Sequence, residues 1–411
     1  MKVFRLTFLA SFLICIFVFS ACKKDEKTEK LKINLGVLLP LTGGGASVGE
    51  SSAAALQLAV QDINLYYKNN GIDAELMISS QDTETDTAVA LQKISMLKEN
   101  GMQLIVGPFT SSNVSNVKNY ADNNDLLVVS PASVSSSLAI VGDNVFRLLP
   151  NDLTQGEAMA AYLNYDDIEI LLPIIRNDTW GNELLTATTQ FFSSENGEVK
   201  DAVKYHAGTT DFSPFISSLK ETLITVLDQY PDEQVGIYVL SYGEAISILK
   251  LASYDSIFNR VRWYGSSGFA ENKNLTADTI VASFAVSRGI PCPTFGLDSA
   301  AIEIWQPLMD RLQNELGRKP EIFAFTTYDA TWLAAETIRA NNVPAEINTI
   351  KTTFTNEAAN YFGATGNTTL NNEGDREYAT YDFWGIRNGT TEYDWKVIAK
   401  FYNETDNLIR Y

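Results

Sequence analysis

The sequence predicts an α/β protein with two similar halves, each a parallel sheet with helices on both faces. From residue 32 onward, short apolar runs alternate with longer amphipathic runs, which is the pattern of strands and helices in such a sheet. The alternation runs to about residue 130 and starts again near residue 168. A chain of 411 residues is also long enough to bury two separate cores.

The first half begins with the buried strand INLGVLL at 33–39, which ends at Pro40. A helix follows the loop 41–49, because apolar residues from Ala55 to Tyr66 recur at steps of three and four, and Gly71 ends it. The later elements expected in this half are a strand at 74–79, a helix at 85–99, a strand at 103–107, a helix at 112–122 and a strand at 126–130.

The second half begins after VFRLLPND at 145–152. Its expected elements are strands at 168–175, 198–205, 234–240 and 260–265, with helices at 181–193, 213–228 and 243–253. Parallel sheets bind ligands beyond the carboxyl ends of their strands, where helix N-termini present free N–H groups. The loops where we therefore expect a site are 41–49, 108–113, 131–137, 176–182, 241–244 and 265–272.

Residues 1–21 have the pattern of a secretory signal: a basic start, the apolar stretch LTFLASFLICIFVF and small residues before Cys22. The stretch is short for a membrane-spanning helix, which needs roughly 20 apolar residues. The run FSAC resembles the bacterial lipobox, so we expect cleavage before Cys22 and lipidation of its thiol. The charged residues 22–30 would then be a tether, and the protein would lie in the cell envelope on the extracytoplasmic side, in the periplasm or at the cell surface.

Composition excludes several classes of function. The net charge of −19 excludes a nucleic acid partner, which requires clustered Lys and Arg. After the signal segment and Cys22, the chain has His206 as its only histidine and Cys292 as its only cysteine. We expect a structural or surface His206 and a buried Cys292, and therefore no metal site, no Cys/His nucleophile and no cofactor. The run Gly43–Gly45 lacks the Lys-Ser or Lys-Thr of a phosphate-binding loop, so we interpret it as a flexible turn beside a cleft.

An enzyme would require acid/base carboxylates that face a cleft, and none of the 50 Asp and Glu residues forms a pair that stands out. The loops instead carry small hydroxyl residues before expected helices. Such residues are helix N-caps or ligands for a carboxylate, and both interpretations stay open. The hydroxyl candidates are Thr110, Ser111, Ser112, Ser133 and Ser135, and the flat apolar candidates in the second half are Trp180, Tyr242 and Phe269.

With these residues identified, the chain resembles the type I periplasmic binding proteins, in the branch of the Leu/Ile/Val-binding receptors of ABC importers. The likeness runs from Ile33 to about Phe401. It rests, in order, on GVLLPLTGGGASVGESSAAALQLAVQDIN, IVGPFTSSN followed by VVSPAS, VFRLLPNDLTQGEAMAAYL, GTTDFSPFI, WYGSSGFA and YDATWLAAETI. The resemblance implies two Rossmann-like lobes joined by a three-crossing hinge, with lobe 1 at 31–149 plus 282–378 and lobe 2 at 150–281 plus 379–411.

The resemblance also assigns roles to residues of the site. Ser111 matches a serine whose hydroxyl and N–H hold an amino-acid carboxylate, and Thr110 lies just before it. Ala132 matches a residue whose carbonyl accepts from an ammonium. Trp180 and Tyr242 match tyrosines of the second lobe that close over the ligand.

Three positions depart from the family pattern. Val134 stands where the family has a threonine, so Ser133 or Ser135 is the substitute candidate, and Ser267 stands where an acidic residue pairs with the ammonium. Val48 replaces an aromatic residue. A buried ammonium without its carboxylate loses a bond worth about 1.5–3 kcal/mol, so the ligand need not be an α-amino acid and we expect an amino acid or a related carboxylate or amide.

The function predicted from the sequence is that of a monomeric solute-binding lipoprotein, not an enzyme. Its expected partners are a small-molecule ligand, an ABC permease and, through the lipid, a membrane. The alternative is the same fold used as a sensor or protein-interaction module, such as an activator of a cell-wall synthase. Such an activator would show an exposed apolar patch and co-purify with its enzyme.

Overall fold

The computed structural model describes residues 30–341, 343–389 and 392–411. One compact unit comprises Lys32–Tyr411. The expected signal segment, Cys22 and the tether up to residue 29 lie outside the described residues, so the expectations for them remain predictions. Within the described part of the chain, no helix combines the length and the apolar character needed to cross a bilayer.

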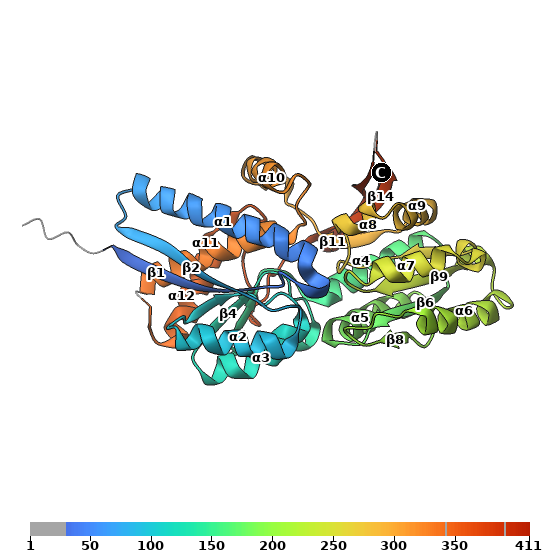
Figure 1. Cartoon of the computed structure of the whole chain (residues 1–411), viewed down its shortest axis with the longest axis horizontal. Helices are drawn as coiled ribbons and strands as arrows, with labels where there is room; N and C mark the ends of the chain where they lie inside the picture. The colour runs from blue at the N-terminus through green and yellow to red at the C-terminus, as the bar shows by residue number, and fades with distance from the viewer. Residues whose placement is uncertain (1–29, 342, 390–391) are drawn as a thin grey trace, which may run out of the picture. The chain divides into compact units, whose positions relative to one another are not determined.

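The first sheet has five strands in the order β2-β1-β3-β4-β5, and β1, β3, β4 and β5 run parallel. Its strands are β1 (Leu31–Leu39), β2 (Ala74–Asp82), β3 (Leu104–Val106), β4 (Leu127–Ser130) and β5 (Val145–Arg147). Helices α1 and α11 cover one face of this sheet, and α2 and α3 cover the other (Figure 1). These helices are α1 (Ala46–Asn69), α2 (Thr87–Glu99), α3 (Ser111–Asn123) and α11 (Phe323–Asn341).

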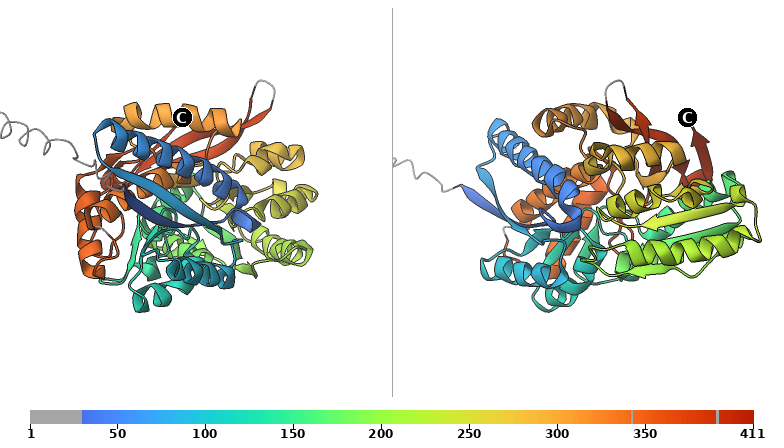
Figure 2. Two further views of the ribbon diagram at one scale, coloured as in Figure 1. Left: turned by 60° about the vertical axis from the view of Figure 1, so that its left-hand side comes forward. Right: turned by 45° about the vertical axis from the view of Figure 1, so that its right-hand side comes forward.

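The second sheet is parallel and centres on β6, with the order β10-β9-β6-β7 and β8 also paired to β6. Side chains of β6 alternate between two cores: Leu171 and Ile175 face α4 and α5, whereas Ile170, Leu172 and Ile174 face α6 and α7. Helices therefore cover both faces of this sheet (Figure 2). The elements are α4 (Asp152–Tyr165), β6 (Ile170–Arg176), α5 (Thr179–Ser194), β7 (Glu198–Val199), β8 (Val203–Tyr205), α6 (Ser213–Leu227), β9 (Val235–Leu240), α7 (Ala245–Ser253) and β10 (Arg262–Tyr264).

A third, antiparallel sheet, which the sequence did not predict, has the order β11-β14-β15-β16. Cys292 on β11 is fully buried, and burial raises the pKa of its thiol, so the expectation of a buried cysteine is confirmed. The remaining elements are α8 (Lys273–Ala277), α9 (Thr279–Arg288), β11 (Cys292–Phe295), α10 (Ile302–Leu316), α12 (Ile347–Asn360), β12 (Phe362–Gly363), β13 (Gly366–Asn367), β14 (Thr380–Asn388), β15 (Tyr393–Tyr402), β16 (Asn407–Arg410) and six short 3-10 turns.

The strands and helices expected from the two alternating series are confirmed to within a few residues, with one exception. The single strand expected at 198–205 is wrong, because β7 and β8 are separate short strands. Both pair with β6, β7 at its start and β8 at its end. Polar Lys200 and Asp201 interrupt the apolar pattern between them, as is common at a sheet edge.

The two parallel sheets share one strand order. In the first sheet β1 lies between β2 and β3, and in the second β6 lies between β7 and β9. The connection after β1 therefore leads to one side of the sheet, and the connection after β3 leads to the other side. The connections after β6 and β9 diverge in the same way. A doubly wound sheet has its ligand crevice at this switch point, beyond the carboxyl ends of the two strands.

Candidate functional site

A small, mainly apolar pocket lies beyond the carboxyl ends of β1, β3, β6 and β9. Its volume of about 60 Å³ is several times the roughly 10–15 Å³ that one water requires, so it suits a ligand of few heavy atoms. The loops of the first sheet contribute Pro40, Gly45, Val48, Phe109, Thr110, Ser111, Ala132 and Val134; those of the second contribute Trp180, Tyr242, Ser267 and Gly268; other segments contribute Leu149, Gln155, Phe295, Phe323 and Tyr381. Both switch points thus border one pocket.

Most residues selected from the sequence meet at this pocket. The predicted residues in its wall are Thr110, Ser111, Ala132, Trp180, Tyr242 and Ser267. Ser133 is not in the wall; it is buried and donates from its hydroxyl to the Ser111 Oγ at 3.0 Å. Phe269 is also absent from the wall, because it is buried in the core beside Cys292. His206 is exposed at the end of β8, as a surface histidine would be.

The hydroxyl oxygen of Ser111 joins two loops of the first sheet. It accepts from the backbone N–H groups of Val134 at 3.2 Å and Ser135 at 3.1 Å, as well as from Ser133. Because these donors occupy the lone pairs of Oγ, the proton of Ser111 is the part of the hydroxyl that can serve a ligand. The backbone N–H of Val134 thus donates to Ser111, while Val134 also lines the pocket.

Thr110 is the N-cap of α3, and its Oγ1 accepts from the N–H of Asn113 at 3.2 Å. The N-cap interpretation is confirmed for this residue. The first N–H groups of a helix, here those of Ser111 and Ser112, have no acceptor within the helix. Together with the helix dipole they favour an anionic group at this end of the pocket.

Aromatic rings form the opposite wall. The rings of Trp180 and Tyr242 stack with centroids 4.7 Å apart and 19° between their planes. The guanidinium of Arg176 lies 5.0 Å from the centroid of the Tyr242 ring. Gly268 allows this close packing, since a Cβ there would lie 2.3 Å from the carbonyl oxygen of Ser241 and 2.6 Å from the Trp180 ring.

Gln155 is a pocket residue that the sequence analysis missed. It lies in α4, is 2 % exposed and lines the pocket, and its Nε2 has no hydrogen-bond partner among the described residues. A buried amide donor without a partner costs free energy unless a ligand or water accepts its bond. The signal that could have found it is a polar residue on the buried face of a helix, but no helix was expected at 152–165.

The described wall residues include no Asp, Glu, Lys, Arg or His. Its tyrosines, Tyr242 and Tyr381, stay neutral because burial raises the pKa of each phenol. Asp152 is buried near these phenols with no hydrogen-bond partner for its carboxyl oxygens in the described structure. Burial, which outweighs the charge of Arg147, raises the pKa of Asp152 well above 3.8. The pocket therefore contains no fixed charge to balance an ammonium group.

Several contacts join elements of the two parallel sheets. The N–H of Gly243 donates to the carbonyl oxygen of Gly44 at 3.3 Å. Lys273 of α8 pairs with Glu50 of α1. The run Gly43–Gly45 forms a 3-10 turn whose last residue lines the pocket, so its expected place beside a cleft is confirmed.

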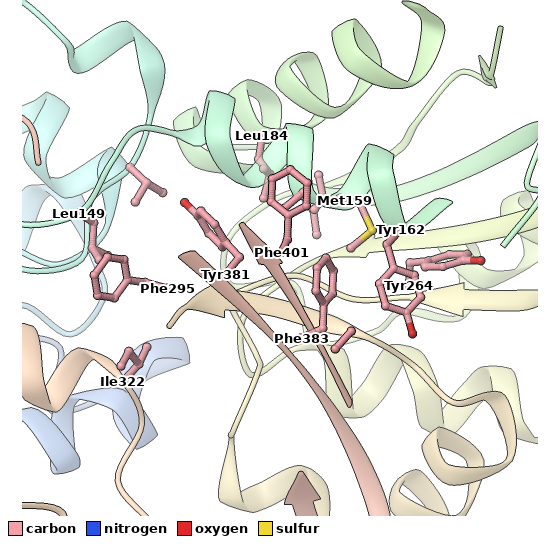
Figure 3. Close-up of a cluster of buried hydrophobic side chains, with 14 of the residues drawn as sticks. Leu149, Met159, Tyr162, Leu184, Tyr264, Phe295, Ile322, Tyr381, Phe383 and Phe401 are labelled. Carbon is pink, nitrogen blue, oxygen red and sulfur yellow. The ribbon is translucent and has the colours of Figure 1, made fainter. Parts of the chain in front are cut away.

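The pocket wall and the protein core share side chains, two of which belong to the third sheet. Leu149, Phe295 and Tyr381 belong both to the pocket wall and to a buried cluster that includes Phe383 (Figure 3). The pocket wall is therefore continuous with the core, which fixes the positions of these side chains.

Two doubly wound sheets thus border one small pocket, at the place where such sheets bind ligands. Residues 32–377 match the family model described as "Periplasmic binding protein", and the chain belongs to this family. Within the family it is a type I protein of the Leu/Ile/Val-binding branch. Membership implies an extracytoplasmic location.

Among curated proteins, an uncharacterized protein of Methanocaldococcus jannaschii is 23 % identical over 95 % of this chain and 96 % of its own length. The Leu/Ile/Val-binding protein BraC3 of Rhizobium johnstonii is 25 % identical over 66 % of this chain and 77 % of its own.

Solved structures share the fold. The substrate-binding protein LivJ of Streptococcus pneumoniae, solved with isoleucine, aligns with a TM-score of 0.73 at 20 % identity, over 92 % of this chain and all of its own. A solute-binding protein of an ABC transporter from R. palustris, solved with benzoate, aligns with a TM-score of 0.70 at 17 % identity, over 89 % of this chain and 96 % of its own. One fold thus accommodates amino acids and an aromatic carboxylate.

Proposed function

We propose that this protein is an extracytoplasmic solute-binding lipoprotein of an ABC importer, and that its ligand is a small carboxylate with an apolar body. The observation that carries the proposal is the pocket at both switch points, which presents a helix N-terminus on one side and aromatic rings on the other. A molecule with one anionic end and one apolar end matches these two walls.

The carboxylate of the ligand lies at the start of α3 in this proposal. There it accepts from the hydroxyl and N–H of Ser111, while Thr110 holds the helix end in place. The free Nε2 of Gln155 supplies a further donor. The apolar body packs against Trp180 and Tyr242.

An α-amino acid is the less favoured cargo. Its ammonium could donate to the carbonyl of Ala132 or the hydroxyl of Ser267, both in the wall, but no wall residue carries a carboxylate. The lost charge-assisted bond costs about 1.5–3 kcal/mol, or roughly ten- to a hundred-fold in affinity. The isoleucine-bound and benzoate-bound relatives represent the two alternatives.

We further propose that the protein closes around its ligand as two lobes. The lobes follow the two parallel sheets, with 31–149 in the first and 150–281 in the second. Helix α9 and Cys292 pack in the core of the second sheet, together with Ile386 and Trp395. We therefore place the second crossing between lobes near Phe295 rather than at residue 282.

Calorimetric titration of the chain without residues 1–21 tests the proposal, with benzoate, 4-methylpentanoate, leucine and isoleucine as probes. We expect binding of a simple carboxylate, and stabilisation of about 2.7 kcal/mol at 100 times its Kd. Ser111→Ala should weaken binding about tenfold, whereas the matched control Ser115→Ala, on an exposed site of the same helix, should not. Tighter binding of leucine would assign an amino-acid cargo. No binding of any probe, with co-purification of a cell-wall enzyme, would favour the interaction module.

The lipid anchor is tested separately in cells. We expect labelled palmitate to be incorporated into the full chain and the protein to sediment with membranes. Cys22→Ala should remove both properties, whereas Cys15→Ala, inside the expected signal, should not. Label retained by Cys22→Ala would overturn the anchor.

A further inference from the structure

A second cavity of about 320 Å³ shares Phe295 with the ligand pocket. It lies between the loop after β11, the β12–β13 turn and the strands β14 and β15. Its charged wall residues are Arg376, Lys400 and Asp298. None of these three lines the ligand pocket.

Arg376 is a buried cation with no carboxylate partner. It is 4 % exposed, and no described acidic side chain lies within ion-pair distance of its guanidinium. Its Nη1 donates to Thr365 Oγ1 at 2.7 Å and its Nη2 to the Thr365 carbonyl at 2.6 Å, but its Nε has no partner. Burial lowers the pKa of Arg376 to about 10, only partly offset by the more distant Asp329 and Asp298.

Arg147 shows how this chain treats a buried guanidinium elsewhere. It is fully buried, and Asp375, the residue before Arg376, accepts from both its Nε and its Nη2. Removing an ion from water costs several kcal/mol unless another charge compensates it. Arg147 has such a charge in direct contact, whereas Arg376 is linked to the Asp329 carboxylate only through the Thr365 hydroxyl, which accepts from Arg376 and donates to Asp329. Among the described residues, Arg376 therefore has no direct anionic partner.

Lys400 adds a second positive charge to the same cavity. Its Nζ lies 3.0 Å from the Asp382 carboxylate, and its side chain is 18 % exposed. The acidic wall residue, Asp298, is held as a cap by the N–H of Ala300, which donates to it at 2.8 Å. Asp298 forms no ion pair with Arg376 among the described residues, although its charge acts on the guanidinium.

We propose that this cavity binds a small oxyanion, a carboxylate or a phosphate, between Arg376 and Lys400. A planar guanidinium matches the paired oxygens of either group. The volume admits a small organic anion. The proposal concerns a site distinct from the ligand pocket and does not depend on the cargo of that pocket.

Calorimetric titration of the full mature chain with acetate, succinate and inorganic phosphate, against a chloride background, tests the proposal. We expect at least one of these oxyanions to bind. Lys400→Met should weaken that binding about tenfold. The matched control Lys396→Met should leave it unchanged, because Lys396 lies on the same strand but pairs with the exposed Asp394. Tighter binding of succinate than of phosphate would identify the oxyanion as a carboxylate. Tighter binding of phosphate would identify it as a phosphate.

Arg376→Lys keeps the charge but loses the planar donor set, so it should weaken binding more than Lys396→Met does. If this buried variant does not fold, the two lysine variants still decide the result. The assignment is overturned if none of the three oxyanions binds. It is also overturned if Lys400→Met and Lys396→Met change the affinity equally, since the binding would then arise from general surface charge.

Discussion

The indole ring of Trp180 stacks on the phenol ring of Tyr242, and both rings border the ligand pocket. We expect Trp180→Ala to lower the affinity for the bound carboxylate by about ten- to a hundred-fold, since a buried aromatic contact contributes roughly 1–3 kcal/mol. Calorimetry measures the change. Trp332→Ala is the matched control, because Trp332 packs against Tyr66 and neither residue lines the pocket. Equal losses in both variants would mean that the stack supports folding rather than binding.

Gln155 offers a test of ligand charge. Gln155→Met keeps the volume but removes the free Nε2 donor, so affinity for a carboxylate should fall about two- to tenfold. Gln155→Glu replaces the donor by a negative charge and should abolish carboxylate binding while improving the relative binding of leucine. Titration with benzoate and leucine measures both effects. The control Gln61→Met alters an exposed residue of α1 and should change neither. Unchanged benzoate binding by Gln155→Glu would place the carboxylate elsewhere.

Asp152 predicts a pH dependence of stability. Burial raises the pKa of Asp152 in the folded protein well above 3.8. Between pH 3.8 and that raised pKa, the folded protein holds a proton on Asp152 that the unfolded chain has released. The free energy of unfolding therefore falls as pH rises above about 4. Asp152→Asn has no such proton to lose and should be more stable than the wild type at pH 7, by on the order of 1–3 kcal/mol. Denaturant unfolding from pH 4 to 8 measures this gap, which should close towards pH 4.

Asp211 is the control for that experiment, because its pKa shift has the opposite sign. A hydrogen bond from the N–H of Ser213 lowers the pKa of its carboxyl. The stability it contributes is present above its unfolded pKa and is lost as pH falls, so Asp211→Asn should be less stable than the wild type at pH 7. A gap for Asp152→Asn that stays constant with pH would contradict a neutral Asp152.

Lys273 and Glu50 join elements of the two parallel sheets. Hydrogen bonds from Lys273 and Arg318 lower the pKa of Glu50. We expect Lys273→Ala to accelerate ligand release about two- to fivefold, because an exposed ion pair contributes at most about 1 kcal/mol. Stopped-flow dissociation measures the rate. The matched control Lys250→Ala breaks the Lys250–Asp278 pair within the second sheet's helices, which has a similar lysine exposure, and should leave the rate unchanged.

The parts of the fold that could be predicted are those with one clear period. Strands such as β6 are uninterrupted apolar runs buried on both faces, and α1 repeats apolar residues at helical spacing. Helix α4 was not predicted because its apolar residues are distributed around the helix and form no single stripe. In the antiparallel sheet, β11 pairs with a strand far along the chain, Cys292 lying opposite Trp384, and no local pattern reveals that pairing. Strands β14, β15 and β16 follow one another and are joined by short turns, in a part of the chain for which no element was predicted.

The site was predictable where a residue directly follows a parallel strand. Thr110 and Tyr242 lie in such loops, and Ser111 and Trp180 lie in the first turn of the helix that follows. Phe295 and Tyr381 were missed because they reach the pocket from the antiparallel sheet. Ser133 was selected by position, but its hydroxyl is committed to Ser111, and no pattern in the sequence reveals that hydrogen bond.

The first turn of α3 has an evolutionary consequence. In the proposed binding mode, the groups of this turn that bind the anion are largely backbone N–H groups, and these persist when side chains are replaced. The pocket walls proposed to contact the rest of the ligand include replaceable side chains, such as Val48, Val134 and Ser267. Proteins that descend from one ancestor can thus change their ligand by point mutation at those positions and keep the same binding site for the acid group.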